Sequence, residues 1–194
     1  MNYDKDFWDE RYVSGNTGWD IGYASTPIVS YIDGIKNKNM KILIPGCGNA
    51  YEAVYFVENG FNDVTLIDIS PVITNRLKTK FGNDKNISIL NSDFFEHQGK
   101  YDLIIEQTFF CSLHPARRES YCIKMNDLLN TGGSISGVLF NSEFEKDGPP
   151  FGGTDIEYRE LFGKHFQIKT LDKCYNSIQP RMGREVFFIL NKKL

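Results

Sequence analysis

Hydrophobic residues along this chain fall into short continuous runs, separated by stretches whose apolar positions recur at helical spacing. The first run, 40–45, contains Ile42, Leu43 and Ile44 in succession, a pattern typical of a strand buried on both faces. Strands of this kind that alternate with helices predict a parallel sheet with right-handed crossovers. The predicted strands are 40–45, 63–68, 86–90, 101–106 and 134–140, and the predicted helices between them are 50–59, 71–81 and 116–129.

The last quarter of the sequence has a different pattern. After a loop rich in glycine and proline at 147–153, a helix near 155–162 leads into two apolar runs, 166–175 and 185–191. A turn around 179–183 joins these runs, so we expect an antiparallel hairpin at the sheet edge. The whole pattern predicts an α/β fold with a doubly wound, mostly parallel, seven-stranded sheet. With no repeat or linker in view, we predict one domain spanning 1–194.

A glycine turn follows the first predicted strand. Gly46 and Gly48 allow the backbone to turn sharply and to approach a ligand without interference from a Cβ atom. Helix 50–59 comes next, and Gly60 stands where a left-handed helix cap belongs. Asp68 ends the second strand, 22 positions after Gly46, close to the offset of roughly 20 residues at which an acid reaches a ribose hydroxyl. This order predicts a nucleoside-binding crevice.

Composition restricts the partners. The net charge of −3 argues against a nucleic acid, which would need a basic face, and no apolar run approaches the ~20 residues that span a bilayer. The four cysteines form no CxxC pair, and acidic residues interrupt any N-terminal signal pattern, so we expect reduced thiols in the cytoplasm. The three histidines lie far apart, so no metal site is predicted. We expect a small-molecule partner and, because no apolar seam remains outside the core, a monomer.

The glycine turn fits S-adenosylmethionine better than a dinucleotide. Tyr51 stands at the third glycine of the dinucleotide fingerprint and Pro45 precedes the turn, and a bulky ring there disfavours a pyrophosphate on the helix N-terminus. Trp8, Tyr12 and Trp19 offer ring faces that attract a sulfonium cation by roughly 0.5–2 kcal/mol. Packing of Trp8 and Tyr12 within an amphipathic helix is the alternative for these rings.

The adenine side of the predicted crevice follows the third strand. Asp68 can accept hydrogen bonds from both ribose hydroxyls, while Asp93 and Phe94 place an acceptor and an aromatic ring where an adenine could pair and stack. An ordinary turn or cap role for Asp93 remains the alternative.

Five segments of the sequence resemble the thiopurine S-methyltransferase superfamily, and most closely its plant-type branch of halide and thiol methyltransferases. These segments are FWDERYVSGNTGWDIGYASTPIV, LIPGCGNAYEAV, LIDIS, YDLIIEQTFFCSLHP and DGPPF. The resemblance implies a Rossmann-like class I methyltransferase fold in which segment 1–36 forms a helical lid over S-adenosylmethionine. The implied cofactor contacts are Trp8, Tyr12, Trp19, Gly46, Asp68, Asp93, Phe94 and Gln107.

The implied reaction is transfer of a methyl group to a small soft nucleophile: a thiol, hydrosulfide, a halide or a thiopurine. Two positions depart from the plant-type pattern: Tyr12 replaces the usual tryptophan, and Gln107 stands where the halide enzymes often carry tyrosine. The second exchange removes an aromatic hydroxyl near the reacting centre and argues against halide as the preferred acceptor. A nicotinamide-dependent reductase and a non-catalytic S-adenosylmethionine-binding module are the alternatives.

The acceptor pocket is expected over the carboxyl ends of the strands. Phe109 and Phe110 are candidate walls, with core packing as the alternative, and Arg181 could attract an anion unless it lies in an exposed hairpin turn. A soft anion needs no general base, and His114 is the nearest candidate for one, with a structural role as the alternative. Cys47 and Cys111 lack a base partner in the sequence, so we do not expect either to act as a nucleophile.

Overall fold

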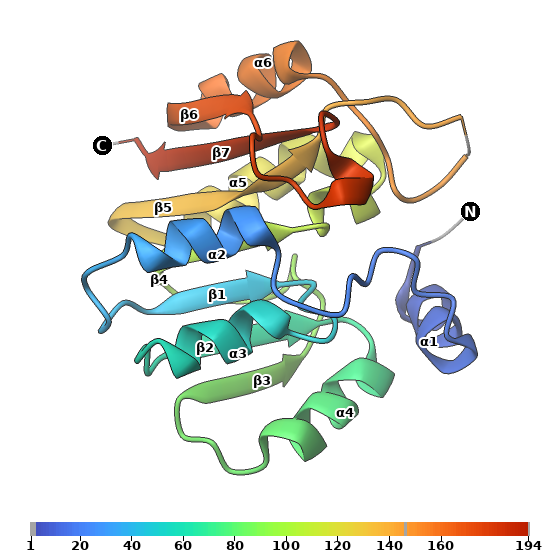
Figure 1. Ribbon diagram of the computed structural model, residues 1–194, viewed down its shortest axis with the longest axis vertical. Helices are drawn as coiled ribbons and strands as arrows, with labels where there is room; N and C mark the ends of the chain where they lie inside the picture. Colours follow the sequence, from blue (N-terminus) through green and yellow to red (C-terminus); the bar gives the residue numbers. More distant parts are fainter. Residues whose placement is uncertain (1–2, 146, 194) are drawn as a thin grey trace.

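The computed structural model describes residues 3–145 and 147–193, and its centre is a seven-stranded sheet in the order β3-β2-β1-β4-β5-β7-β6 (Figure 1). The first five strands pair in parallel, and β7 runs antiparallel to both β5 and β6. The predicted doubly wound sheet with an antiparallel C-terminal hairpin is therefore confirmed. The strands are β1 (Ile42–Pro45), β2 (Val64–Asp68), β3 (Ile87–Asn91), β4 (Tyr101–Gln107), β5 (Leu129–Phe140), β6 (Phe166–Lys173) and β7 (Glu185–Lys192).

Helices cover both faces of this sheet. Side chains of α2, α3 and α4 pack on one face in a cluster that includes Ile28, Phe56 and Leu77, and α5 and α6 pack on the other through Tyr121 and Phe162. The helices are α1 (Lys5–Ser14), α2 (Thr26–Asp33), α3 (Tyr51–Glu58), α4 (Pro71–Phe81), α5 (Arg118–Leu128) and α6 (Asp155–His165), with short 3-10 turns η1 (Phe110–Ser112), η2 (Pro115–Arg117) and η3 (Gln179–Arg181).

Helix α1 lies outside this layered arrangement. It stands beyond the ends of the strands to which the arrows of β1 and β2 point in Figure 1. Asp4 caps it by accepting from the amides of Asp6 and Phe7, and among the helices and strands it packs mainly against α4. Helix α1 therefore borders the carboxyl edge of the sheet, where open α/β proteins bind ligands.

Local signals set several element boundaries as the sequence predicts. Ser70 caps α4 by accepting from the Ile73 amide, with Pro71 in the first turn, and Gly60 has a left-handed φ of 86° after α3. At α2 the capping residue is Ser25, so the Thr26 hydroxyl is not used as the helix cap. The Thr26 hydroxyl donates instead to the carbonyl of Asn176 at 2.6 Å, which ties α2 to the loop between β6 and β7.

The fifth strand starts earlier than the predicted 134, because residues 130–133, whose Asn-Thr-Gly-Gly sequence is typical of a turn, belong to β5. The strand begins at Leu129, immediately after α5, and its register with β4 shifts between Tyr101 and Leu103. Gly132 has a φ of 79°, which explains how a turn-like sequence is accommodated inside a strand at a bulge. Among the described residues, no helix is long and apolar enough to cross a membrane.

Candidate active site

Asp68 lies at the carboxyl end of β2 and is 6% exposed. Its Oδ2 accepts from the Gly48 amide at 3.2 Å, and its Oδ1 accepts from the Ser70 amide at 3.0 Å. Burial raises its pKa to about 6, and these backbone amides oppose that rise. A carboxylate has about four lone-pair sites, so each oxygen retains the capacity to accept a hydroxyl of a ribose.

The glycine turn between β1 and α3 brings two other segments against the crevice. Gly46 and Gly48 have φ values of 55° and 50°, as a sharp turn requires. A Cβ added at Gly46 would lie 2.3 Å from Cδ2 of Phe109, and one added at Gly48 would lie 3.5 Å from the hydroxyl of Tyr12. The turn therefore contacts both the loop after β4 and helix α1.

Trp8, Tyr12 and Trp19 form one aromatic cluster, as a shared cofactor role requires. The ring of Trp19 lies edge-on to both others, with centroids 5.5 Å from Trp8 and 5.8 Å from Tyr12. Tyr12 is buried, whereas the two tryptophans are half-buried. These rings belong to what we call the lid segment, residues 3–25.

Polar contacts hold the lid segment in place. Asp9 accepts from the Ser70 hydroxyl and, at 3.4 Å, from the Val72 amide at the start of α4. The Arg76 guanidinium donates to the Tyr12 carbonyl at 3.0 Å. These contacts join helix α1 to the N-terminal half of α4, directly after the Asp68 turn.

A second group of contacts holds the other end of the lid segment. Arg181 is 8% exposed and donates to the Trp19 carbonyl at 2.8 Å, with Nη1 lying 3.6 Å from Glu185 Oε1. The alternative that Arg181 sits in an exposed hairpin turn is therefore wrong. Glu52, at the start of α3, accepts from the Ser25 amide at 3.0 Å.

The adenine-side candidates have defined local roles. Oδ1 of Asp93 accepts from the Phe95 amide at 2.8 Å, so Asp93 does shape its own turn. Phe94 is 4% exposed, and its ring centroid lies 5.1 Å from that of Phe109. Both residues stand directly after β3, on the same side of the sheet edge as Asp68.

The end of β4 carries a buried acid that the sequence analysis did not single out. Glu106 has no exposed surface; its Oε1 accepts from the amides of Phe109 and Phe110, and its Oε2 accepts from the Tyr121 hydroxyl. Burial raises its pKa to about 7, and the three donors oppose that rise. A charged residue directly after the apolar run 103–105 was the signal available in the sequence.

Gln107, next in the chain, ends β4. Its Oε1 is buried without a hydrogen-bond partner among the described residues. Buried polar atoms are almost always paired in proteins, so this oxygen fits a donor from a bound ligand.

The two phenylalanines in the loop after β4, residues 108–115, lie in different surroundings. The ring of Phe109 lies against the glycine turn and is half-buried. Phe110 is 1% exposed among the rings of Tyr121, Tyr158 and Phe162. The expectation that Phe110 lines the acceptor pocket is therefore corrected: it is a core residue.

His114 has a structural hydrogen bond, and the two candidate thiols are buried. His114 is exposed, and its Nδ1 accepts from the Ala116 amide at 3.2 Å at the start of η2. Burial raises the pKa of Cys47 well above its usual range and that of Cys111 to about 12. Both thiols therefore stay protonated near neutral pH, and across residues 3–145 and 147–193 no cluster suited to a metal ion is found.

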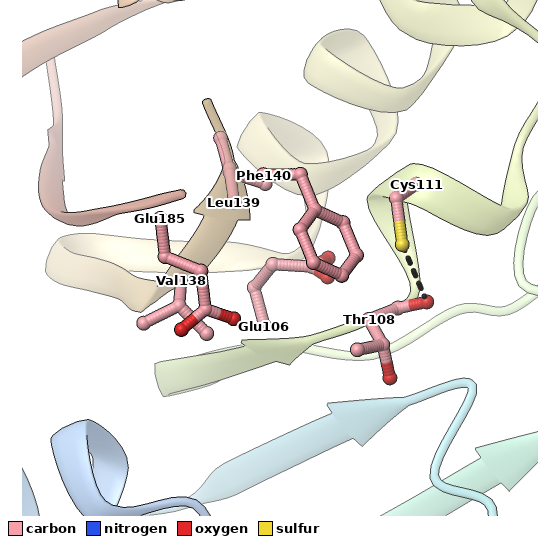
Figure 2. Close-up of a pocket in the computed structure, with 7 residues that line it drawn as sticks. All are labelled: Glu106, Thr108, Cys111, Val138, Leu139, Phe140 and Glu185. Atoms are coloured by element: carbon pink, nitrogen blue, oxygen red, sulfur yellow. Dashed lines mark hydrogen bonds between the residues drawn. The ribbon is translucent and has the colours of Figure 1, made fainter. Parts of the chain in front are cut away.

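A small cavity of about 10 Å³ lies beside this loop, close to the space that one water molecule needs. Figure 2 shows the ring of Phe140 and the carboxyl groups of Glu106 and Glu185 at this cavity, with the Cys111 thiol directed at the Thr108 carbonyl. It lies at the ends of β4 and β5 and the start of β7. The lining residues are Glu106, Thr108, Cys111, Val138, Leu139, Phe140 and Glu185.

The site therefore combines a ribose-type acid, a glycine turn and an aromatic lid at one sheet edge. Comparison with known proteins identifies the family. The thiopurine S-methyltransferase family model matches residues 3–192. Probable thiol methyltransferase 2 of Arabidopsis thaliana is 32% identical over 184 residues, which cover 92% of this chain and 81% of that protein.

One further relative and one solved structure extend the comparison. Thiocyanate methyltransferase 1 of Brassica oleracea is 25% identical, with 92% of this chain and 81% of that protein covered. The structure of the Burkholderia thailandensis 1,6-didemethyltoxoflavin-N1-methyltransferase with bound 1,6-didemethyltoxoflavin and S-adenosylhomocysteine matches with a TM-score of 0.77 at 20% identity, covering 98% of this chain and 87% of that one. The structural likeness supports the fold.

Proposed function

The chain belongs to the thiopurine S-methyltransferase family and is an S-adenosylmethionine-dependent methyltransferase for a small nucleophile, and on this basis we propose how its residues divide the task. The alternatives of a nicotinamide-dependent reductase and of a non-catalytic module give way to this assignment. The observation that carries the proposal is the Asp68 carboxylate, buried at the end of β2 and held by the Gly48 amide at 3.2 Å.

Five groups of residues would hold the cofactor. Asp68 would accept the ribose hydroxyls, and the turn at Gly46 would lie against the nucleoside. Asp93 and Phe94 would contact the adenine edge. The lid rings would face the sulfonium, an attraction of roughly 0.5–2 kcal/mol for a cation over a ring, and the unpartnered Oε1 of Gln107 would accept a donor from the cofactor. The proposed cofactor-binding set is Trp8, Tyr12, Trp19, Gly46, Asp68, Asp93, Phe94 and Gln107.

Bound S-adenosylmethionine supplies a methyl group on a positively charged sulfur that leaves readily. The chain's own contribution is therefore position and exclusion of water. The lid segment, held through Asp9 and Arg181, covers the carboxyl edge of the sheet. His114 is exposed and already accepts a backbone amide, which supports a reaction that needs no general base.

We propose a soft, anionic or easily ionised acceptor: a thiol, hydrosulfide, a halide or a thiopurine. The names of two relatives, a probable thiol methyltransferase and a thiocyanate methyltransferase, support sulfur as the attacking atom. Phe109 would form a wall of the acceptor site. The buried guanidinium of Arg181 would favour an anion there, although Glu185 at 3.6 Å offsets part of its charge.

Two measurements test this proposal. Calorimetry with S-adenosylmethionine, S-adenosylhomocysteine and NADPH should give binding of the first two only. Incubation with S-adenosylmethionine and iodide, hydrosulfide, thiocyanate, small thiols or a thiopurine should then release S-adenosylhomocysteine, fastest with a sulfur acceptor. Absence of turnover with every compound would contradict the proposed acceptor class.

We also propose that the protein is a monomer in the cytoplasm. All four cysteines are buried and unpaired in the structure, the usual state of thiols in that compartment. Light scattering after size exclusion should give the mass of one chain, 22.3 kDa; a doubled mass would overturn the monomer.

A further inference from the structure

Glu106 connects the end of β4 to two other segments. One carboxylate oxygen accepts from the amides of Phe109 at 2.8 Å and Phe110 at 2.9 Å, and the other accepts from the Tyr121 hydroxyl at 2.8 Å. The residue is fully buried. An acid in such a place is stabilised only by donors of this kind, so the side chain and the loop that surrounds it depend on each other.

The strand beside Glu106 makes room for it. Gly137 of β5 pairs with Glu106 in the parallel ladder. A Cβ added at Gly137 would lie 2.2 Å from the Glu106 carbonyl oxygen and 2.6 Å from its Cβ. A glycine inside a strand often marks a close approach of this kind, so β4 and β5 are built to keep the acid where it is.

The loop that receives these hydrogen bonds contains a strained residue. Thr108 has a φ of 61°, a left-handed conformation that is a genuine outlier for a β-branched side chain. Such conformations persist only when the surroundings hold them, and they cluster at functional sites. The amides of the next two residues donate to Glu106, and the Cys111 thiol donates to the Thr108 carbonyl, so Glu106 supplies two of the contacts that hold this turn.

The position of this turn determines what faces the crevice. Phe109 lies so close to the glycine turn that a Cβ at Gly46 would overlap its ring, and it also contacts the ring of Phe94. Through the backbone of Phe109, Glu106 therefore sets the wall that touches both proposed cofactor segments.

We propose that Glu106 is a positioning residue for methyl transfer, which fixes the strained turn at Thr108 and so places the Phe109 wall beside the acceptor. The inference rests on the proposed location of the acceptor next to residues 108–115. Glu106 acts through the backbone of this loop rather than on the reacting atoms. Its carboxylate does not abstract a proton in this role, since both oxygens are already occupied by donors.

Two substitutions at position 106 distinguish the effect of the acceptor oxygens from the effect of side-chain volume. Glu106→Met keeps the approximate volume but removes both acceptor oxygens, whereas Glu106→Gln keeps one carbonyl oxygen for the two amides. Tyr101→Phe is the matched control, because it removes a buried hydroxyl that pairs with His97 at 2.8 Å at the opposite end of the same strand. Tyr121→Phe is a milder variant that removes one of the three donors.

Hydrogen exchange of the amides at 109 and 110, measured by mass spectrometry of the full chain, reads the loop directly. We expect exchange to accelerate in Glu106→Met and to stay slow in Glu106→Gln and Tyr101→Phe. The value of kcat/KM for the acceptor should fall by about tenfold to a hundredfold in Glu106→Met, since a misplaced positioning group can cost that much. The affinity for S-adenosylhomocysteine should change far less, and Glu106→Gln should restore most of the rate.

Unchanged exchange at 109 and 110 in Glu106→Met would overturn the inference. Faster exchange with unchanged kcat/KM would overturn it too, and would place the failure in the proposed acceptor location. If kcat/KM falls in proportion to a loss of thermal stability, and Tyr101→Phe shows the same fall, then Glu106 has only a structural role. If Glu106→Met does not fold, Tyr121→Phe makes the same comparison, with a smaller acceleration of exchange expected and its absence counting against the inference.

Discussion

Asp68 is the residue on which cofactor binding should depend most. Its two oxygens accept one backbone amide each, and two ribose hydroxyls would complete its coordination. We expect Asp68→Ala to weaken S-adenosylhomocysteine binding by roughly 1.5–3 kcal/mol for each charge-assisted hydrogen bond lost. Calorimetry measures the change, with Asp63→Ala, an exposed acid before the same strand, as the control. Equal affinity in Asp68→Ala and the wild type would show that the ribose acid lies elsewhere.

The protonation of Asp68 gives cofactor binding a pH dependence. Burial raises the pKa of this carboxyl to about 6, and only the ionised form can accept hydrogen bonds from both hydroxyls. Affinity should therefore rise as the pH increases from about 5 to 7 and level off above that. Titration calorimetry across this range tests the sign, and Asp68→Asn should abolish the dependence. An affinity that falls over the same interval would contradict the assignment.

Gly46 is required for two separable reasons. Any side chain there must adopt a φ of 55°, which costs about 1–2 kcal/mol, and a Cβ would also overlap the Phe109 ring at 2.3 Å. We expect Gly46→Ala to lower both thermal stability and turnover. Gly60→Ala shares the left-handed backbone, with a φ of 86° and open space around the added Cβ. It should lose stability alone, so a matching loss of turnover in both variants would refute the role of the ring contact.

At the scale of elements, helix α1 is attached to the sheet through α4. Asp9 accepts from the Ser70 hydroxyl and the Val72 amide, so its carboxylate lies at the N-terminus of α4, where negative charge is favoured. Asp9→Ala should loosen the lid and raise KM for S-adenosylmethionine by about tenfold, the equivalent of roughly 1.4 kcal/mol. Steady-state kinetics measures the shift. Glu10→Ala, an exposed neighbour on the same helix, should leave KM unchanged, and a similar KM in the two variants would mean that Asp9 does not hold the lid.

The helices and strands also show which parts of the structure can be predicted from the sequence alone. Apolar runs, glycines and caps predicted the order of elements, because each depends on residues adjacent in the chain. The strand start at Leu129 was missed, since residues 130–133 bulge out of a pairing with Tyr101 and Leu103 of β4, which lie far away in the sequence. The role of Asp9 was missed and that of Arg181 was misjudged for a related reason. Both form contacts across elements, at separations of 61 and 162 residues for the bonds to Ser70 and Trp19.

Over the whole molecule, buried carboxyl groups gather at the edge of the sheet that would bind the ligands. Burial raises the pKa values of Glu52, Asp68, Glu106 and Glu185. Desolvation of an acid favours its neutral form, so each of these groups is more difficult to ionise in the folded chain than in the unfolded one. The fold therefore retains acids that destabilise it near neutral pH, an arrangement common at functional sites.

This arrangement predicts how stability varies with pH. Because the folded-state pKa values are raised, the folded chain binds more protons than the unfolded chain between about pH 4.5 and 7, so the free energy of unfolding should fall as pH rises through that window and level off above it. Burial lowers the pKa of His97, so this group alone makes the free energy of unfolding rise with pH and opposes part of the fall. Urea unfolding at several pH values measures the slope. Glu106→Gln, which cannot ionise, should show a shallower decline than the wild type, and identical slopes in the two proteins would mean that Glu106 is already ionised in the folded state throughout the window.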